Sequence, residues 1–92
     1  MQVNLYATFR LLAGEKSLYI DLPEGATVRE LITAVVERLP VLRTHWLSDN
    51  GELHAHVHIF VNGEDVQNLP DGLDTRLPAN ATVDCLPPVA GG

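Results

Sequence analysis

The sequence predicts an α+β domain in which one main helix packs on one face of a mixed β-sheet. Apolar and polar residues alternate over 2–9, 54–61 and 82–86, and this two-residue period is typical of half-buried strands. Between the first two of these segments, apolar residues recur at helical spacing over 27–39. Because a long loop precedes the final strand, we expect that strand to lie parallel beside the first. A chain of 92 residues is one small domain.

The N-terminal segment is expected to form a β-hairpin. In its first strand, polar residues alternate with Val3, Leu5, Ala7 and Phe9. A second alternating strand covers 17–22, and residues 13–16 supply the turn between the two strands. One face of this hairpin would then be buried beneath the helix.

The main helix is predicted to run from Thr27 to Leu39. Thr27 is followed three residues later by Glu30, which is the spacing of a capping box at a helix N-terminus. One apolar stripe is formed by Val28, Leu31, Ile32, Val35 and Leu39. Pro40 ends this helix or begins a short second one, and 41–47 could add a helical turn that covers one end of the sheet.

The second half of the chain is predicted to contribute the remaining strands. In a third strand, one face carries Ala55, Val57, Ile59 and Val61, and the other carries His54, His56, His58 and Phe60. Asn62-Gly63 indicates a tight hairpin turn, because both residues tolerate positive φ, and 64–66 would be a brief return strand. After a loop-rich stretch, the last strand covers 82–86 with Val83 and Cys85 facing inward, and Pro87-Pro88 ends it.

The charge balance bears on the kinds of partner that the chain can bind. Lys and Arg number 6 against 12 Asp and Glu, a formal net charge of −6, which disfavours nucleic acids and anionic membranes and favours basic protein surfaces. The single cysteine excludes an intramolecular disulfide and fits a reducing compartment. The first residues do not have the pattern of a signal peptide, and no apolar run reaches the ~20 residues of a membrane span, so we expect a cytoplasmic protein.

Residues with catalytic or metal-binding chemistry are few. The sequence has neither a phosphate-binding glycine loop nor a nucleophile elbow, so we expect a protein that is not an enzyme by itself. His54, His56 and His58 would share one strand face and could hold a metal, but strand alternation already explains them and no metal site is predicted. The inward parity of Cys85 predicts a buried, inert thiol.

Two features of the sequence indicate protein–protein contact. Tyr6, Phe60 and Leu86 are apolar side chains at outward positions of three strands, and a cluster of this kind on a sheet indicates an interaction patch. Pro87-Pro88 then directs the chain away from the sheet, into a short tail of small residues that ends in two glycines. We therefore divide the chain into a folded domain, 1–87, and a flexible tail, 88–92.

Several short stretches match the pattern of a known family. They are Leu5-Tyr6-Ala7 with Phe9-Arg10, Ala26-Thr27-Val28 with Leu31, 61–66, Leu77-Pro78 and, above all, 87–92, which reads Pro-Pro-Val-Ala-Gly-Gly. On these residues the chain resembles, over essentially its whole length, the ubiquitin-like β-grasp sulfur carriers, the family that includes the small subunit of molybdopterin synthase. It departs from the family pattern where Asn80-Ala81-Thr82 replaces an acidic turn and where Leu86 replaces a large aromatic residue.

The resemblance implies that the chain is a sulfur carrier and the small subunit of molybdopterin synthase. An E1-like adenylating enzyme would use ATP to activate the carboxylate of Gly92, and a persulfide sulfur would replace AMP to give a thiocarboxylate. That sulfur would pass to a cyclic pyranopterin phosphate in molybdenum cofactor biosynthesis. Because ATP would be bound by the activating enzyme, we expect no cofactor on this chain.

The resemblance also implies which residues meet the partners. The tail would insert into the large synthase subunit, and it consists of Val89, Ala90, Gly91 and Gly92. The interface with the large subunit and with the adenylating enzyme would be lined by Tyr6, Phe60, Leu86, Pro87 and Pro88.

Other roles are compatible with the same residues. A ubiquitin-like modifier would be joined through Gly92 to lysines of target proteins; because Lys16 is the one lysine here, branched chains of the modifier itself are disfavoured. A thiamine-pathway sulfur carrier shares the Gly-Gly end, although such carriers are usually shorter and lack the double proline. A plain binding or metal-holding module would use His54, His56 and His58.

Overall fold

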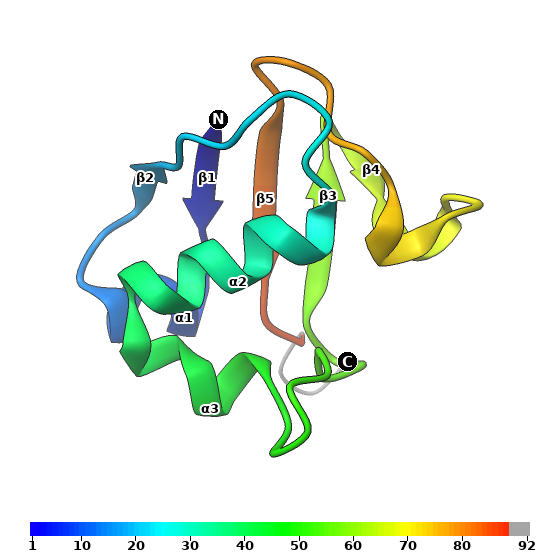
Figure 1. Ribbon diagram of the computed structural model, residues 1–92. Helices are drawn as coiled ribbons and strands as arrows, with labels where there is room; N and C mark the ends of the chain where they lie inside the picture. The colour runs from blue at the N-terminus through cyan, green and yellow to red at the C-terminus, as the bar shows by residue number, and fades with distance from the viewer. Residues whose placement is uncertain (89–92) are drawn as a thin grey trace.

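The computed structural model describes residues 1–88, and within them five strands form one mixed sheet in the order β2-β1-β5-β3-β4 (Figure 1). The strands are β1 (Gln2–Leu5), β2 (Ser17–Tyr19), β3 (His58–Val61), β4 (Glu64–Asp65) and β5 (Thr82–Leu86). β1 and β5 run parallel, with Val3 opposite Val83, and the other neighbouring pairs are antiparallel. The predicted α+β class is confirmed, and so is the pairing of the first strand with the last.

The main helix, α2 (Val28–Arg38), crosses one face of the sheet (Figure 1). Its N-terminus has the predicted capping box: the Glu30 N–H donates to Thr27 Oγ1 over 3.2 Å, and the Thr27 N–H donates to Glu30 Oε1 over 3.0 Å. Four residues of the predicted stripe are buried, and Leu39 is partly buried at the C-cap. Val36 is also buried, so the apolar face of α2 is wider than the stripe predicted from the sequence.

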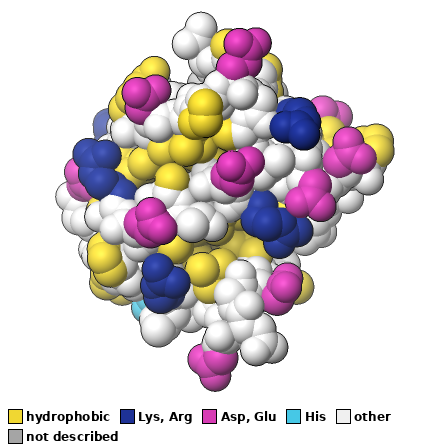
Figure 2. All heavy atoms as spheres, viewed as in Figure 1, with side chains coloured by type: hydrophobic (Ala, Val, Ile, Leu, Met, Phe, Trp, Pro, Cys, Tyr) yellow, Lys and Arg dark blue, Asp and Glu magenta, His cyan; other side chains and the backbone are white. Residues whose placement is uncertain are grey.

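The outer surface of α2 and its surroundings carries acidic and basic side chains interspersed with apolar ones (Figure 2). On the buried side, the helix meets inward side chains of the sheet, among them Val3, Leu5, Ile59, Val83 and Cys85. Within residues 1–88, no helix is long and apolar enough to cross a membrane.

Replacing Leu31 by alanine is expected to lower the free energy of unfolding by about 2–5 kcal/mol, because it removes a buried aliphatic side chain and leaves a cavity. Leu31 is only 1% exposed and belongs to the core. Thr33→Ala is the matched control on the same helix, since Thr33 is exposed. Urea unfolding of both variants measures the difference; equal midpoints would mean that α2 is not packed on the sheet.

The prediction of a tight turn between the first two strands is wrong. β1 ends at Leu5, and a short helix, α1 (Ala7–Ala13), leads to β2. The stretch Ala-Thr-Phe-Arg-Leu-Leu-Ala is rich in good helix formers. Gly14 ends the helix in the left-handed conformation at φ 72°, and its N–H donates to the Arg10 carbonyl over 2.9 Å. β1 and β2 are still antiparallel neighbours, and β2 is shorter than the predicted 17–22.

Phe9 is buried, as its parity predicted, but it reaches the core from a helix rather than from a strand. Its ring packs edge-on against Trp46, with the ring centroids 5.5 Å apart. Trp46 lies in α3 (Arg43–Trp46), which follows the 3₁₀ helix η1 (Pro40–Leu42). Pro40 therefore begins a second helix, and fully buried Leu42 and Trp46 make it part of the core.

The predicted third strand is also too long, because β3 begins only at His58. His58 lies opposite Leu86, the last residue of β5, and the next residue, Pro87, has no N–H for a ladder. Residues 54–57 therefore have no strand to pair with. They form a turn, in which the Val57 N–H donates to the His54 carbonyl over 3.1 Å.

The remaining connections follow the sequence closely. Asn62 and Gly63 have φ values of 50° and 87° and form the predicted tight turn between β3 and β4. Two 3₁₀ helices, η2 (Val66–Asn68) and η3 (Gly72–Asp74), lie in the loop-rich stretch before β5. Asn80 has a φ of 60°, so the turn before β5 keeps a left-handed residue despite its departure from the family pattern.

Candidate partner-binding face and C-terminal tail

The sheet face opposite α2 brings together the three outward side chains singled out from the sequence. Tyr6, Phe60 and Leu86 line one shallow, open depression of about 310 Å³, together with Gly63 and Asp84. Tyr6 follows β1, Leu86 ends β5 and Phe60 lies in β3, so the depression spans three adjacent strands. We call these five residues the apolar patch. Its formation agrees with the sequence prediction, and its use as a partner interface remains a prediction.

Asp84, the polar residue of the apolar patch, holds two neighbouring side chains by hydrogen bonds. Its Oδ1 accepts hydrogen bonds from Asn4 Nδ2 over 2.8 Å and from the Tyr6 hydroxyl over 3.1 Å. Burial and this hydrogen bond to Asp84 raise the pKa of Tyr6 above that of a free tyrosine, so the phenol stays protonated at neutral pH and keeps donating. The ring of Tyr6 is therefore held in place at the edge of the patch.

The tail leaves the sheet beside this patch. Pro87 is half-buried and Pro88 is exposed, directly after Leu86 at the end of β5. At the same end, the Tyr6 N–H donates to the Cys85 carbonyl over 3.3 Å. Val89, Ala90, Gly91 and Gly92 lie outside the described residues, so their predicted roles and the predicted boundary of the tail remain predictions.

Cys85 faces the core from β5 and is 2% exposed. Burial, with a smaller contribution from the Asp84 charge, raises the pKa of its thiol far above the ordinary value, so almost no thiolate is present at neutral pH. This agrees with the predicted inert thiol.

Folded protein is therefore expected to resist alkylation by iodoacetamide at about pH 8, because the reagent needs an accessible thiolate. In concentrated guanidinium chloride Cys85 should react completely, since unfolding exposes the side chain. Intact mass spectrometry after matched incubation times measures both rates. Equal rates with and without denaturant would overturn the burial of this thiol.

The three histidines do not lie on one strand, so the predicted strand arrangement is wrong. His54 and His56 lie in the turn before β3 with their rings stacked, 5.0 Å between centroids and 12° between planes, while His58 lies in β3. His54 Nε2 lies 3.4 Å from the carbonyl oxygen of Thr44. In the part of the chain that the structure describes, no group of three or more His, Cys, Asp or Glu could hold a metal ion.

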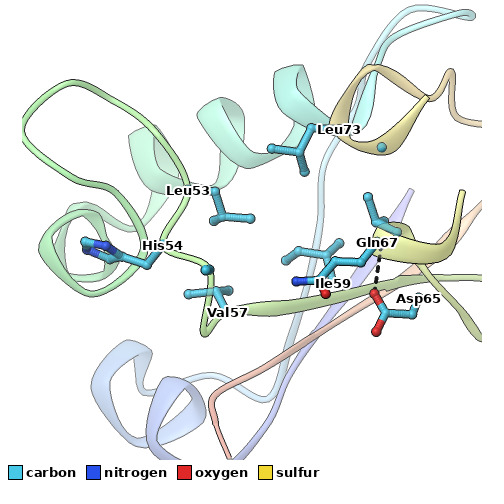
Figure 3. Close-up of a pocket in the computed structure, with 10 residues that line it drawn as sticks. Leu53, His54, Val57, Ile59, Asp65, Gln67 and Leu73 are labelled. Carbon is cyan, nitrogen blue, oxygen red and sulfur yellow. Dashed lines mark hydrogen bonds between the residues drawn. The ribbon is translucent and has the colours of Figure 1, made fainter. Parts of the chain in front are cut away.

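A cavity that the sequence did not indicate lies between the 53–57 segment and η3 (Figure 3). It has a volume of about 170 Å³ and mostly aliphatic walls, including Leu53, Val57, Ile59 and Leu73. Asp65, at its polar side, accepts a hydrogen bond from the Gln67 N–H over 2.9 Å. Its mostly aliphatic lining suits an apolar group. Its walls all come from residues 53–73, but the turn before β3 and the 3₁₀ helices that form them carry no periodic pattern that indicates a cavity.

The family model described as the ThiS family matches residues 3–92. Among curated proteins, small archaeal modifier protein 3 of Haloferax volcanii is 35% identical over 92 residues, covering 100% of this chain and 98% of the relative.

Solved structures resemble the fold over nearly the whole chain. In a crystal structure of the Amycolatopsis orientalis BexX/CysO complex, the matching chain has a TM-score of 0.79 and 34% identity, with 99% of this chain and 98% of that chain covered. A putative molybdopterin converting factor, subunit 1, from Pyrococcus furiosus has a TM-score of 0.74 and 32% identity, with 96% and 95% covered. The first of these shows a protein of similar fold in complex with another protein.

Proposed function

Because the chain belongs to the ThiS family, we propose that it is a ubiquitin-like, β-grasp carrier whose terminal glycine, Gly92, is activated as an acyl adenylate and then loaded with sulfur. One observation supports this above the others. The strand that leads to the Gly-Gly tail ends at Leu86, which lines the apolar patch, and the half-buried Pro87 and the exposed Pro88 follow it directly. A partner that covers the patch would therefore receive the tail.

The proposed chemistry starts from a carboxylate, which is a poor acyl donor. Attack of the Gly92 carboxylate on the α-phosphorus of ATP would form the acyl–AMP anhydride and release pyrophosphate. The terminal sulfur of a persulfide would then attack the carbonyl carbon and break the bond to AMP. A thiol reductant would cleave the resulting acyl disulfide and leave the thiocarboxylate on Gly92. The activating enzyme would bind ATP, and this chain would bind no cofactor of its own.

The composition of the tail suits this chemistry. Six residues from Pro87 reach roughly 20 Å when extended, long enough to enter a partner's active site while the folded domain stays outside. The two terminal glycines carry no side chains and could pass through a narrow channel. Enclosure there would exclude water and protect the activated acyl group from hydrolysis.

For the sulfur acceptor, we propose a cyclic pyranopterin phosphate, with this chain as the small subunit of molybdopterin synthase. The Pro-Pro-Val-Ala-Gly-Gly ending and the similarity to the Pyrococcus furiosus protein support this choice. The tail residues Val89 to Gly92 would enter the large subunit, and the apolar patch with Pro87 and Pro88 would contact it. Both reactions would take place in the cytoplasm.

A second candidate is a protein modifier, in which a lysine of a target protein replaces AMP on Gly92. The 35% identity to a Haloferax volcanii protein named as a modifier favours it. A carrier for the thiamine pathway is a third possibility with the same activation step. All three share the acyl adenylate of Gly92 and differ in the nucleophile that follows.

Intact mass spectrometry of the protein purified from its own cells tests the shared step. We expect a fraction of the chain to carry one sulfur in place of one oxygen at the C-terminus. Adding the large synthase subunit and cyclic pyranopterin phosphate should discharge this sulfur, with two loaded carriers supplying the two sulfurs of one dithiolene. Isopeptide adducts on other proteins, without pterin sulfuration, would favour the modifier. A chain with neither thiocarboxylate nor adducts would contradict the proposal.

A further inference from the structure

A second depression lies on the outer sheet face, toward the β1–β2 edge. It has a volume of about 240 Å³ and is lined by Gln2, Asn4, Tyr6, Arg10, Lys16 and Ser17. We call these six residues the cationic groove. Two of the six basic residues of the chain line it, and no carboxylate does.

Both basic residues are attached to the end of β1, Arg10 through its side chain and Lys16 through its backbone. The Leu5 N–H donates to the Lys16 carbonyl over 2.9 Å, and the Leu5 carbonyl accepts from Arg10 Nε over 3.3 Å. The guanidinium carbon of Arg10 lies 5.9 Å from the centre of the Tyr6 ring. Because the Tyr6 N–H also binds the Cys85 carbonyl, the Tyr6 end of the groove lies next to the last residues of β5.

Neither cation of the groove forms an ion pair with a carboxylate in the part of the chain that the structure describes. Within residues 1–88, the one ion pair joins Arg29 to Asp74, so neither Arg10 nor Lys16 takes part in one. One carboxylate, Asp84, borders the groove through its hydrogen bonds from Asn4 and Tyr6, so the two cations outnumber the adjacent negative charge. Elsewhere, around α2, acidic and basic side chains are interspersed (Figure 2). The groove is thus a locally positive site on a protein of net charge −6.

We infer that the cationic groove docks an acidic segment of the activating enzyme, beside the apolar patch. The inference rests on the proposed function. Tyr6 belongs to both surfaces, so a partner seated on the patch also reaches the groove. Arginine and lysine at such a site favour carboxylates, and a serine hydroxyl and two amides add neutral donors. The site is open and shallow, which suits side chains carried on a protein better than a small free anion.

The groove would add a fixed orientation to the attraction that the net charge alone predicts. An acidic protein attracts basic surfaces, which speeds encounter without fixing orientation. The net negative charge of this chain would repel a carboxylate of the partner from most of the surface. Only at the groove would Arg10 and Lys16 bind it. This contact would therefore fix how the two proteins are oriented in the complex, so that the end of β5 faces the partner's active site.

The test compares two double variants with the same change in net charge. Arg10→Gln/Lys16→Gln removes both charges from the groove, whereas Arg38→Gln/Arg43→Gln removes two exposed charges outside it. Binding to the E1-like adenylating enzyme encoded in the same genome is measured by calorimetry at several salt concentrations. We expect the groove variant to bind about tenfold more weakly and with a shallower salt dependence, and the control to bind nearly as the wild type does.

Further variants separate charge from other roles of these residues. Lys16→Arg keeps the charge but cannot accept an isopeptide bond, and it should bind as the wild type does. Melting curves identify any variant that does not fold. If the double variant does not fold, the single variant Lys16→Gln, which changes an exposed residue, is used for the binding measurement instead. Inorganic phosphate should displace the enzyme no better than chloride at equal ionic strength.

Three results would overturn the inference: equal weakening by both double variants, unchanged binding of the groove variant, or displacement by phosphate alone. An enzyme that binds the wild-type chain through the groove but never forms the thiocarboxylate, as judged by mass, would instead contradict the proposed function. The two failures are therefore distinguishable, because one is measured by affinity and the other by the C-terminal mass.

Discussion

Removing Gly92 will abolish formation of the C-terminal thiocarboxylate while leaving the melting temperature nearly unchanged. The deletion moves the reacting carboxylate back by one residue, about 3.5 Å, and a misplacement of only 1 Å can cost about 10²-fold in a positioned reaction. Gly91→Val is expected to have the same effect, because its branched side chain would not pass where two glycines do. Within residues 1–88, every buried residue of the core lies at or before Cys85, so the deletion removes none of them.

A reconstituted assay with the activating enzyme, sulfur donor and large subunit measures this effect, alongside a melting curve. Ala90→Gly is the matched control, because it changes the tail but keeps its length. It should support sulfur transfer at close to the wild-type rate. If the chain without Gly92 still sulfurates the pterin at the wild-type rate, the sulfur-carrier assignment fails.

Replacing Leu86 by aspartate will weaken binding of both the activating enzyme and the large subunit by at least about 30-fold, since the centre of an interface typically contributes about 2 kcal/mol or more per hot-spot residue. Leu86 lines the apolar patch and is only half-buried in the free protein. A carboxylate there would be desolvated by any partner that covers the patch.

Thr82→Asp provides the control for this substitution. Thr82 lies on the same strand and faces the same side, four residues from Leu86, but it does not line the patch. It adds the same charge to the same face and should leave both affinities nearly unchanged. Loss of binding in both variants would indicate a general charge effect, and retained binding in Leu86→Asp would remove the patch from the interface.

The elements that the sequence predicted well are those defined by local chemistry. The capping box of Thr27 and Glu30 begins α2 where the spacing placed it, and Asn62-Gly63 turns because both residues accept positive φ. β5 has the predicted bounds, since its alternation ends at two prolines that cannot donate. The apolar side chains of the patch were predicted from the alternation of inward and outward residues along three segments.

The elements that were missed depend on information from elsewhere in the chain. Phe9 is inward both in a continued strand and in a helix that begins at Ala7, so its pattern could not decide between them. The alternation from His54 to Val61 is unbroken, and what shortens β3 is the end of its partner at Leu86. Likewise, Arg10 and Lys16 line one groove because α1 returns the chain to β1, where Leu5 binds the Arg10 side chain and the Lys16 backbone.

The central pairing of β1 with β5 has a consequence for biosynthesis. Asn4 and Asp84, which are hydrogen-bonded across this pair, are separated by 80 residues. β1 is therefore synthesised first but cannot pair with β5 until nearly the whole chain has been made. A topology dominated by such distant pairs folds late and as a unit. A nascent or prematurely terminated chain that lacks β5 would lack both the middle of the sheet and the residues that follow it. Under the proposed function, Gly92 would therefore be synthesised only after every strand of the sheet, and an activating enzyme would meet it on a chain that can complete its fold.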